Sequence, residues 1–375
     1  MNTNTEILIV GGGLSGLAAA WQLSRANMDV ILVDSRDRIG GRVLTSDGCD
    51  LGPSWIWSGQ PLVASALDRL DIPFFEQHGQ GQSVYQDATG RVQVIDEPSS
   101  MSGSLRISGG VGKLATEMRN QIESSRIRLR HHVDAISKQG DSIHIHCQTP
   151  KGPQIFEAQK IAIAIPPRLA AEIDYSPALP LPTIQKLQAT PTWMAGHAKF
   201  FAVYDSPFWR NNGLCGTAVS RKGPMAEIHD ATPAAENQFV LFGFVGLNPA
   251  KRASMGEARI TERAIQQFVE LFGDKAGSPK STHYQDWSLE EFTAAASDRV
   301  PQTRHPKYGL QLDVGADWQG KLSFTASETS FLNGGLIEGA LEAAQAFVRE
   351  CTKSPNAKGS DSTPHTASMG WDWFW

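Results

Sequence analysis

The sequence contains few cysteine residues, and they lie far apart. Four cysteines occur in 375 residues, and none forms a CxxC pair: they are Cys49, Cys147, Cys215 and Cys351. A disulfide framework and a zinc site are therefore not expected. We predict no metal site and a reducing compartment.

Long hydrophobic runs and an excess of basic residues are also missing. No stretch approaches the roughly 18 apolar residues of a membrane span, and no signal-peptide pattern opens the chain. The formal net charge is -5, so the composition gives no attraction to nucleic acid or anionic membranes. These absences predict a cytoplasmic protein with no membrane span and no nucleic-acid partner.

What is present is an ordinary globular composition, with 41% hydrophobic residues and a length that suits two domains or one large one. The apolar pattern predicts an opening strand, helix and strand at 7–10, 14–25 and 30–33. Further helices are expected at 62–70, 112–122, 258–272 and 335–349. Further strands are expected at 128–136 and 142–148, as a hairpin, and at 160–165, 198–204, 216–219, 239–245 and 322–326. Residues 353–375 are typical of a flexible tail, and their aromatic end is a candidate lid or docking peptide.

A glycine-rich turn, GGGLSG at residues 11–16, joins the first expected strand to the first helix. Gly11 permits a tight turn, Gly13 lets the backbone approach a pyrophosphate, and Gly16 lets the helix pack closely on the strand. The start of the helix offers free N–H groups and a positive dipole end to an anion. Asp34 ends the second strand, where a carboxylate can accept both ribose hydroxyls. This context favours dinucleotide binding over the alternative that the glycines serve only the turn.

A second motif, DSRDRIGGR at residues 34–42, continues from the acid. An N-terminal GxGxxG followed by an acid and RxGGR resembles the flavin-dependent amine oxidases, notably the monoamine oxidases. The likeness runs on through residues 50–56, 108–114, 163–167, 324–330 and 333–340, and implies a bound FAD. The cofactor-binding residues that the resemblance implies are Gly11, Gly13, Leu14, Ser15, Gly16, Asp34, Ser35, Arg36, Gly40, Gly41, Arg42, Gly52, Pro53, Ser54, Trp55, Val133, Ile165, Glu328, Gly335, Leu336 and Ile337.

Two residues match catalytic positions of this family. Lys199 lies in the expected strand 198–204, where the family places a lysine that holds a water against the flavin and assists the reaction with O2. A fixed cation there would stabilise developing negative charge. Trp287 resembles the tryptophan that packs beside the flavin. The alternatives are a solvent-facing lysine of an alternating strand and a tryptophan of the core.

Several departures from the monoamine oxidases concern the substrate. Ser297 and Leu336 stand where two aromatic residues flank the amine, and Ala296 falls near the cysteine that tethers flavin in some members, so we expect non-covalent FAD. Trp55 stands where L-amino acid oxidases place an arginine for the substrate carboxylate, which favours an amine substrate. The substrate-pocket candidates are Trp55, Trp57, Ser297, Phe331 and Leu336.

The larger oxidases carry a helical insert that is missing between residues 78 and 106 of this chain. We therefore expect an open substrate site, which a homodimer or another protein partner could complete.

The resemblance implies an α/β fold with a Rossmann-like (GR2-type) FAD-binding domain and an interleaved α+β substrate domain built on an antiparallel sheet. The FAD-binding domain is expected to comprise residues 1–73, 107–170 and 318–352, and the substrate domain residues 74–106 and 171–317. The expected activity is oxidation of an amine to an imine, with O2 reduced to hydrogen peroxide. The alternatives are an FAD-dependent dehydrogenase, desaturase or L-amino acid oxidase of a biosynthetic pathway, and a partner-dependent or non-catalytic flavoprotein.

Overall fold

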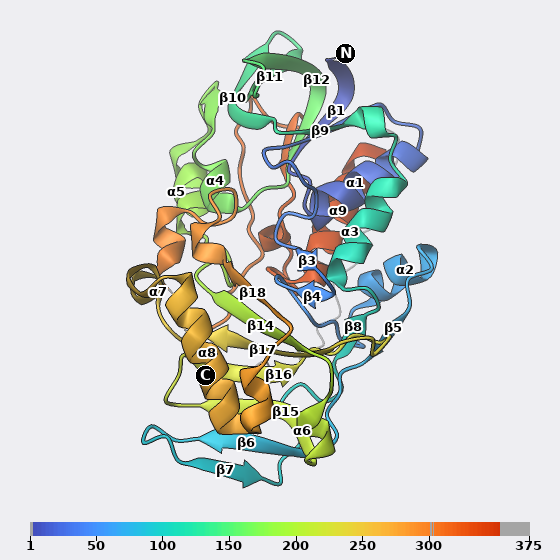
Figure 1. The fold of residues 1–375 in the computed structure, drawn as a ribbon. Helices are drawn as coiled ribbons and strands as arrows, with labels where there is room; N and C mark the ends of the chain where they lie inside the picture. The colour runs from blue at the N-terminus through green and yellow to red at the C-terminus, as the bar shows by residue number, and fades with distance from the viewer. Residues whose placement is uncertain (1–2, 301, 303, 353–375) are drawn as a thin grey trace.

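Two β-sheets organise the protein, and Figure 1 shows the body built on the first sheet above the body built on the second. The computed structural model describes residues 3–300, 302 and 304–352. The tail expected at 353–375 lies outside the described residues. Within the described part of the chain, no helix is long and apolar enough to cross a membrane.

The first sheet has eight strands in the order β13-β10-β11-β12-β1-β2-β9, with β19 paired to β12. Their bounds are β1 (Asn4–Val10), β2 (Val30–Asp34), β9 (Ile127–Leu129), β10 (His132–Gln139), β11 (Ser142–Gln148), β12 (Gln154–Ile163), β13 (Asp174–Ser176) and β19 (Leu322–Phe324). The neighbours β9, β2, β1, β12 and β19 run parallel. The parallel strands and the glycine-rich turn after β1 make this the Rossmann-like part of the fold.

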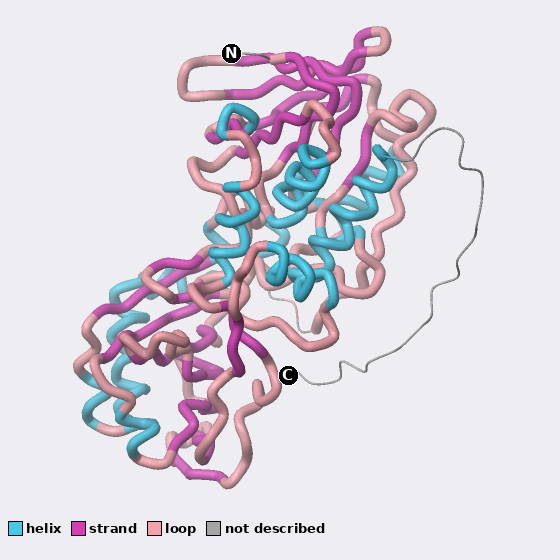
Figure 2. The backbone as a smooth tube through the Cα atoms, turned by 90° about the vertical axis from the view of Figure 1, so that its right-hand side faces the viewer, coloured by secondary structure: helices cyan, strands magenta, loops and turns pink. Residues whose placement is uncertain are grey.

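Helices cover one face of the first sheet. They are α1 (Leu14–Arg25), α2 (Pro61–Arg69), α3 (Val111–Asn120) and α9 (Ile337–Thr352), and their buried residues form one core with β1 and β2. The opposite face packs against α4 (Pro167–Ala170), α5 (Leu181–Ala189) and the buried Trp318. Figure 2 shows from the side how strands and helices separate into layers.

The second sheet has seven strands in the order β18-β14-β17-β16-β15-β6-β7. Their bounds are β6 (Gln82–Gln86), β7 (Val92–Ile95), β14 (Ala198–Tyr204), β15 (Leu214–Ser220), β16 (Met225–Asp230), β17 (Phe239–Val245) and β18 (Ser281–Asp286). Neighbours are antiparallel except for β6 and β15. The amphipathic helix α8 (Glu257–Phe272) covers one face, where Phe268 meets Phe200 with ring centroids 5.8 Å apart. The other face packs Phe201 and Phe242 against Leu51 of the first body.

Short elements complete the described chain. They are the helices α6 (Phe208–Asn211) and α7 (Pro249–Met255), the strand pairs β3 (Thr45–Ser46) with β4 (Cys49–Asp50) and β5 (Phe74–Glu76) with β8 (Leu105–Ile107), and 3-10 turns at Ser124–Arg126, Asp274–Gly277, Trp287–Leu289, Ala296–Arg299 and Ser327–Thr329.

The expected α/β fold class is confirmed, but the single strand expected at 128–136 is wrong. Arg130 adopts a positive φ of 58° and interrupts the extended chain. As a result β9 pairs with β2, whereas β10 pairs with β11. β16, β18 and the short helices of the second body were not predicted from the sequence. The domain boundaries given above remain a prediction.

A buried ion pair joins α7 to the end of β18. The Nε and Nη2 atoms of Arg252 each lie 2.7 Å from one carboxylate oxygen of Asp286. Nη2 also donates to the carbonyl of Gly196, 2.9 Å away, just before β14. Both charged side chains are almost fully buried. Removal of one partner would leave the other charge buried without compensation.

We predict that Arg252→Leu lowers the free energy of unfolding by about 3–5 kcal/mol, the usual cost of breaking a buried ion pair. Urea denaturation measures this change. Lys280→Met is the control, because Lys280 and Asp205 are both exposed and such a pair contributes about 1 kcal/mol or less. Similar losses in the two variants would contradict the prediction.

Candidate active site

The turn after β1 has the geometry expected of a dinucleotide-binding loop. Gly11 has a φ of 108°, and its N–H donates to the carbonyl of Val33, 2.8 Å away. A Cβ atom on Gly16 would collide with the carbonyl oxygen of Gly11, so only glycine allows α1 to approach β1 this closely. A Cβ atom on Gly13 would meet no atom within 4 Å. The space beside Gly13 is thus open at the point where a pyrophosphate would approach.

The N-terminus of α1 is free to bind an anion. Among the described residues, no side chain caps this helix, so the first N–H groups remain available. The Ser15 hydroxyl donates to the carbonyl of Thr325, which brings the segment after β19 to the same place. The Thr325 hydroxyl is buried without a hydrogen-bond partner in the described part of the chain. These donors fit the diphosphate of FAD.

Asp34 lies at the carboxyl end of β2, as predicted. Its carboxylate accepts from the N–H groups of Gly12 at 2.6 Å and Arg36 at 2.8 Å. Burial raises the pKa of this carboxyl, although both hydrogen bonds oppose the shift. The start of β10 lies alongside, because the His131 N–H donates to the Asp34 carbonyl at 2.9 Å. This link places the buried Val133 near the expected adenosine end of the site.

The loop with Gly40 and Gly41 packs on the glycine-rich turn. The Gly40 N–H donates to the carbonyl of Gly12, 2.8 Å away, and a Cβ atom on Gly41 would lie 3.1 Å from Gly13 Cα. Ile165, on the return from β12, approaches the same turn, because a Cβ atom on Gly11 would lie 2.8 Å from its Cγ2 atom. Residues far apart in the sequence therefore surround the open space beside Gly13.

The two predicted arginines pair with carboxylates of the protein. Arg36 pairs with Glu290 at 3.0 Å and donates to Thr293 at 2.8 Å. Ser35 and Arg36 also line a cavity of about 520 Å³ at this edge of the protein. Arg42 pairs with the fully buried Glu328 at 2.6 Å. Both guanidinium groups are thus held by residues that follow them by more than 250 positions in the sequence.

Lys199 is buried in β14 and does not face solvent, so the solvent-facing alternative is wrong. The side chain points from the second sheet into the segment 50–54 of the first body. Its Nζ donates to the carbonyl oxygens of Asp50 at 3.1 Å and Gly52 at 2.5 Å, and to the Ser54 hydroxyl at 2.8 Å. Burial lowers the pKa of Lys199 to about 7, although the charge of Asp50 opposes this shift.

Aromatic rings surround the amino group on its remaining sides. Nζ lies 4.8 Å from the ring centroid of Phe242, 5.2 Å from that of Phe244 and 5.9 Å from that of Trp55. Trp55 was predicted from the sequence as a pocket residue, whereas Phe242 and Phe244 were not. The alternation of strand 239–245 holds the relevant signal, since residues 242 and 244 share one face.

Trp287 is buried and, like Lys199, donates a hydrogen bond to the segment 50–54. Its indole Nε1 donates to the carbonyl of Leu51, 2.8 Å away. Pro53 lies within this segment, and a Cβ atom on Gly52 would collide with the carbonyl oxygen of Arg42. Two residues of the second body therefore fix the backbone expected beside the flavin.

The other pocket candidates are more scattered. Ser297 is exposed in the turn Ala296–Arg299, and Phe331 is 66% exposed. Trp57 is half-buried in the loop before α2. Leu336 is half-buried and precedes Ile337, the first residue of α9.

The turn before α9 is covered by aromatic side chains that the sequence analysis did not single out. A Cβ atom on Gly335 would lie 2.9 Å from the Tyr308 ring and 3.2 Å from Trp193 Cβ. Gly335 has a φ of 78°, which explains the glycine.

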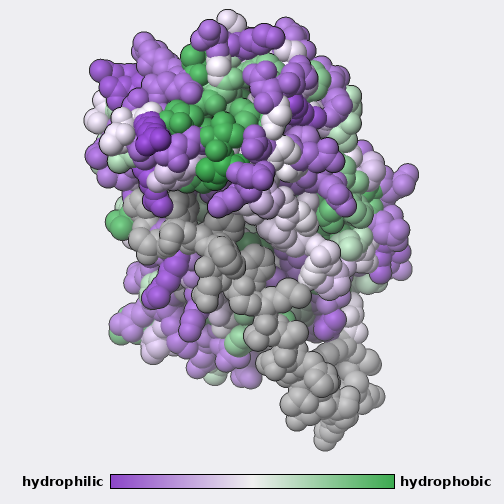
Figure 3. Space-filling model, turned by 90° about the horizontal axis from the view of Figure 1, so that it is seen from below, coloured by the Kyte–Doolittle hydropathy of each residue, from purple (hydrophilic) through white to green (hydrophobic). Residues whose placement is uncertain are grey.

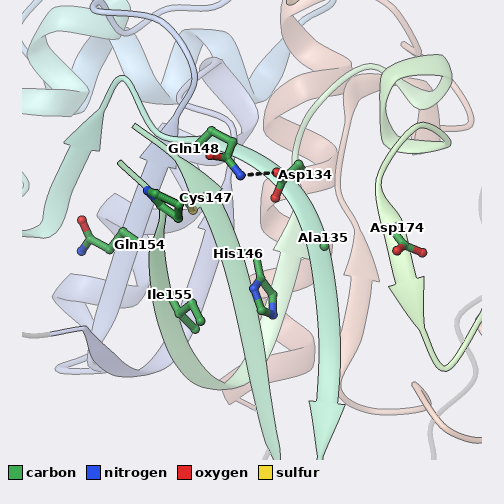
Figure 4. A pocket seen from close by; sticks show the side chains of 9 residues that line it. Asp134, Ala135, His146, Cys147, Gln148, Gln154, Ile155 and Asp174 are labelled. Atoms are coloured by element: carbon green, nitrogen blue, oxygen red, sulfur yellow. Dashed lines mark hydrogen bonds between the residues drawn. The ribbon is translucent and has the colours of Figure 1, made fainter. Parts of the chain in front are cut away.

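A separate cavity of about 390 Å³ lies among β10, β11, β12 and β13. Figure 4 shows its lining, in which Gln148 donates to Asp134 over 2.6 Å. These strands lie at the far end of the upper body from β14 in Figure 1, and none of the predicted site residues lines this cavity. We do not assign it to the candidate site.

Two family models match this chain. Residues 95–352 match the family model described as flavin containing amine oxidoreductase, and residues 9–70 match that of an NAD(P)-binding Rossmann-like domain. The flavin-containing amine oxidase B of Mus musculus is 23% identical over 462 aligned positions, which cover 93% of this chain and 86% of the relative. The amine oxidase B of Homo sapiens is 22% identical with the same coverage.

Solved structures show the same fold. A wild-type putrescine oxidase bound to putrescine superposes with a TM-score of 0.76 at 20% identity, covering 94% of this chain and 99% of that protein. Cyclohexylamine oxidase from Brevibacterium oxydans gives a TM-score of 0.76 at 20% identity, covering 93% of this chain and all of that one.

We predict that Gly13→Ala weakens FAD binding by about tenfold or more, because the methyl group occupies the approach of the pyrophosphate. The backbone at Gly13 has φ −73° and ψ −178°, which alanine adopts without strain, so the fold should be retained. Flavin absorbance after gel filtration measures the bound fraction. Gly59→Ala is the matched control, since a Cβ atom there also meets nothing within 4 Å but lies in another loop. Full flavin retention in both variants would contradict the prediction.

The lowered pKa of Lys199 predicts a pH-dependent stability in the flavin-free protein. Between pH 7 and 10.5 the unfolded chain carries a proton on this residue that the folded protein lacks. The free energy of unfolding should therefore rise with pH, relative to Lys199→Met, by about 1.4 kcal/mol per pH unit in this window. Below pH 7, Lys199 is protonated in both the folded and the unfolded state. The difference in free energy of unfolding between the two proteins should therefore not change with pH there. Urea denaturation of both proteins across this range checks the sign, and a difference that falls with pH would refute it.

Proposed function

Since this chain belongs to the flavin containing amine oxidoreductase family, we propose that it is an FAD-dependent oxidase that converts an amine to an imine and O2 to hydrogen peroxide. The observation that carries this proposal is the buried Lys199, which meets the segment 50–54 at the junction of the two bodies. FAD, the cofactor of this family, supplies the redox chemistry when bound by taking a hydride equivalent from the α-carbon of the amine.

The residues of this chain bind and position the reactants. Asp34 would hold the ribose hydroxyls of FAD, and the N-terminus of α1 would bind its diphosphate. Lys199 provides an amino group that can hold a water molecule or stabilise developing negative charge on O2. Trp287 fixes the backbone at Leu51 by a hydrogen bond from its indole N–H. No acid–base pair is needed if the amine arrives uncharged.

The substrate proposed is an amine and not an amino acid. Trp55 stands where amino acid oxidases place an arginine. Its ring packs on Phe242 and Phe244, and its indole N–H donates to Gln77 at 2.9 Å. It presents no cation to a substrate carboxylate. We also propose that FAD is bound non-covalently, because Ala296 occupies the position nearest the tethering cysteine of some members.

The substrate side is proposed to be open. The alignments with the mammalian relatives extend over 462 positions, more than the 375 residues of this chain, so those proteins contain segments that it lacks. Residues 82–95 form the hairpin β6–β7 at the edge of the second sheet, where we expected a shortened lid. A second copy or another protein could cover this side.

A peroxide-coupled screen of the flavin-loaded protein against alkylamines, polyamines and L-amino acids tests the proposal. We expect peroxide with an amine, and a fall of about 10²–10³-fold in kcat/KM for O2 in Lys199→Met, the usual effect of removing a group that stabilises the transition state. Lys280→Met is the control and should retain activity, because Lys280 is exposed.

Other outcomes of the screen assign other activities. Flavin reduction by an amine under anaerobic conditions, followed by slow reoxidation with O2, would identify a dehydrogenase and overturn the oxidase proposal. Peroxide with an L-amino acid alone would overturn the proposed substrate class.

A further inference from the structure

The strand β7 ends the second sheet and pairs with β6 alone among the described strands. Figure 1 shows β6 and β7 at the lower end of the molecule. Figure 3 views the molecule from below and shows hydrophobic residues gathered into one area among hydrophilic ones. Within β7, the side chains of Val92 and Val94 are 37% and 54% exposed. An apolar edge strand is therefore open to solvent at this end of the protein.

The backbone of β7 presents hydrogen-bonding groups at this edge. At the turn of the hairpin, the N–H of Asp87 donates to the carbonyl of Arg91 over 3.1 Å, which makes these two residues a hydrogen-bonded pair. Hydrogen-bonded and non-hydrogen-bonded pairs alternate along an antiparallel ladder. Val92 and Val94 therefore fall at non-hydrogen-bonded positions opposite β6. Their N–H and C=O groups point outwards, where another strand can pair with them.

The strands at the other ends of the two large sheets carry charged residues, and β7 does not. Of these strands, β9 contains Arg128, β13 contains Asp174 and β18 contains Asp286. Charged residues, prolines and bulges are the usual means by which proteins prevent association at a free edge. β7 has the sequence Val-Gln-Val-Ile and pairs with β6 without a bulge. This edge therefore lacks the usual protection against pairing with another strand.

Charged residues of opposite sign flank β7. Arg91 precedes the strand and Glu97 follows it; both are exposed, and neither forms an ion pair within the described part of the chain. If β7 pairs antiparallel with β7 of a second copy about a two-fold axis at Val94, each Arg91 lies opposite the partner's Glu97. The neighbouring register, centred on Gln93, would place Arg91 opposite the partner's Ile95. Charge complementarity thus favours a second copy of this chain and the register centred on Val94.

We propose that two copies of this chain associate through β7, so that their second sheets join edge to edge across a two-fold axis. In this dimer Val94 lies opposite the partner's Val94, and Val92 lies diagonal to it on the same face. The valines of both copies bury one another, between ion pairs that join Arg91 to the partner's Glu97. The inference goes beyond amine oxidation and does not depend on it, because no residue of β7 belongs to the candidate site.

Disulfide cross-linking of the full-length, flavin-loaded protein tests the register. In the proposed pairing the two Val94 Cα atoms lie about 5.5 Å apart, a distance that a disulfide bridges. Val94→Cys should therefore form a covalent dimer under mild oxidation, measured on a non-reducing gel. Val92→Cys is the matched control on the same strand and face, because its two copies lie about 14 Å apart along the strands and should not cross-link. The native cysteines are buried or half-buried, so the wild type should not cross-link either.

Light scattering after gel filtration tests the ion pairs, and we expect the wild type to have the mass of two chains. Arg91→Glu places like charges opposite each other and should raise the dissociation constant of the dimer by about tenfold or more. The double variant Arg91→Glu with Glu97→Arg restores opposite charges and should restore the dimer. Within one chain these two residues lie about 20 Å apart along the strand, so an ion pair inside a single copy cannot account for the rescue.

Val94→Lys places two ammonium groups at the axis and should give a monomer. Leu181→Lys is its control and should remain a dimer, because Leu181 is 67% exposed on α5 of the first body. Flavin absorbance and the melting temperature verify that each variant is folded. A monomeric wild type would overturn the proposal, as would a dimer that persists in Val94→Lys or that cross-links equally through Val92→Cys. The proposed amine oxidation would stand in each of these cases, since the peroxide screen measures it separately.

Discussion

The amino group of Lys199 lies in the interior of the protein, where a charge or a polar group must find partners. Three oxygen atoms of the segment 50–54 supply them, and aromatic faces surround the remaining side. The lysine belongs to the second sheet and the oxygens to the first body. The position of one body on the other is thereby coupled to the hydrogen bonds of a single side chain, and a shift between the bodies would leave the lysine unsatisfied.

Other contacts reinforce this junction from both sides. Trp287 donates to Leu51, next to the oxygens that receive Lys199. The Asp50 side chain accepts from the N–H of Val111 at the start of α3, over 2.8 Å. Asp50 Oδ2 has no hydrogen-bond partner among the described residues, and Arg106 lies 3.9 Å away. Burial raises the pKa of this carboxyl, with the charge of Arg106 opposing the shift. The segment 50–54 is therefore a rigid strip of backbone between a Rossmann-like core and an antiparallel sheet.

Local chemistry explains which features could be predicted from the sequence. The turn at Gly11–Gly16 and helix α1 depend on a short motif whose residues have one practical structural solution. The burial of Lys199 is not such a case, because the alternation of its strand allows a solvent-facing lysine. The break between β9 and β10 was missed, because the alternation of residues 128–136 continues through Arg130 and only pairing with different neighbours separates the strands. The partners of Arg36 and Arg42 come from residues more than 250 positions away. No local pattern contains that information.

The contrast between local motifs and long-range pairing also separates the cofactor-binding loops from the face of the second sheet. Residues that would bind the cofactor lie in loops at the ends of strands, and their identity is constrained by the shape of the diphosphate and ribose. On the second sheet, by contrast, register alone decides which side chains share the face of Lys199, as its pairing opposite Phe244 shows. A substitution at such a position leaves the sheet intact, because the side chain faces the site and not the core beneath α8. Family motifs therefore fix the loops of the first body, whereas the face of the second sheet depends on strand register that no motif describes.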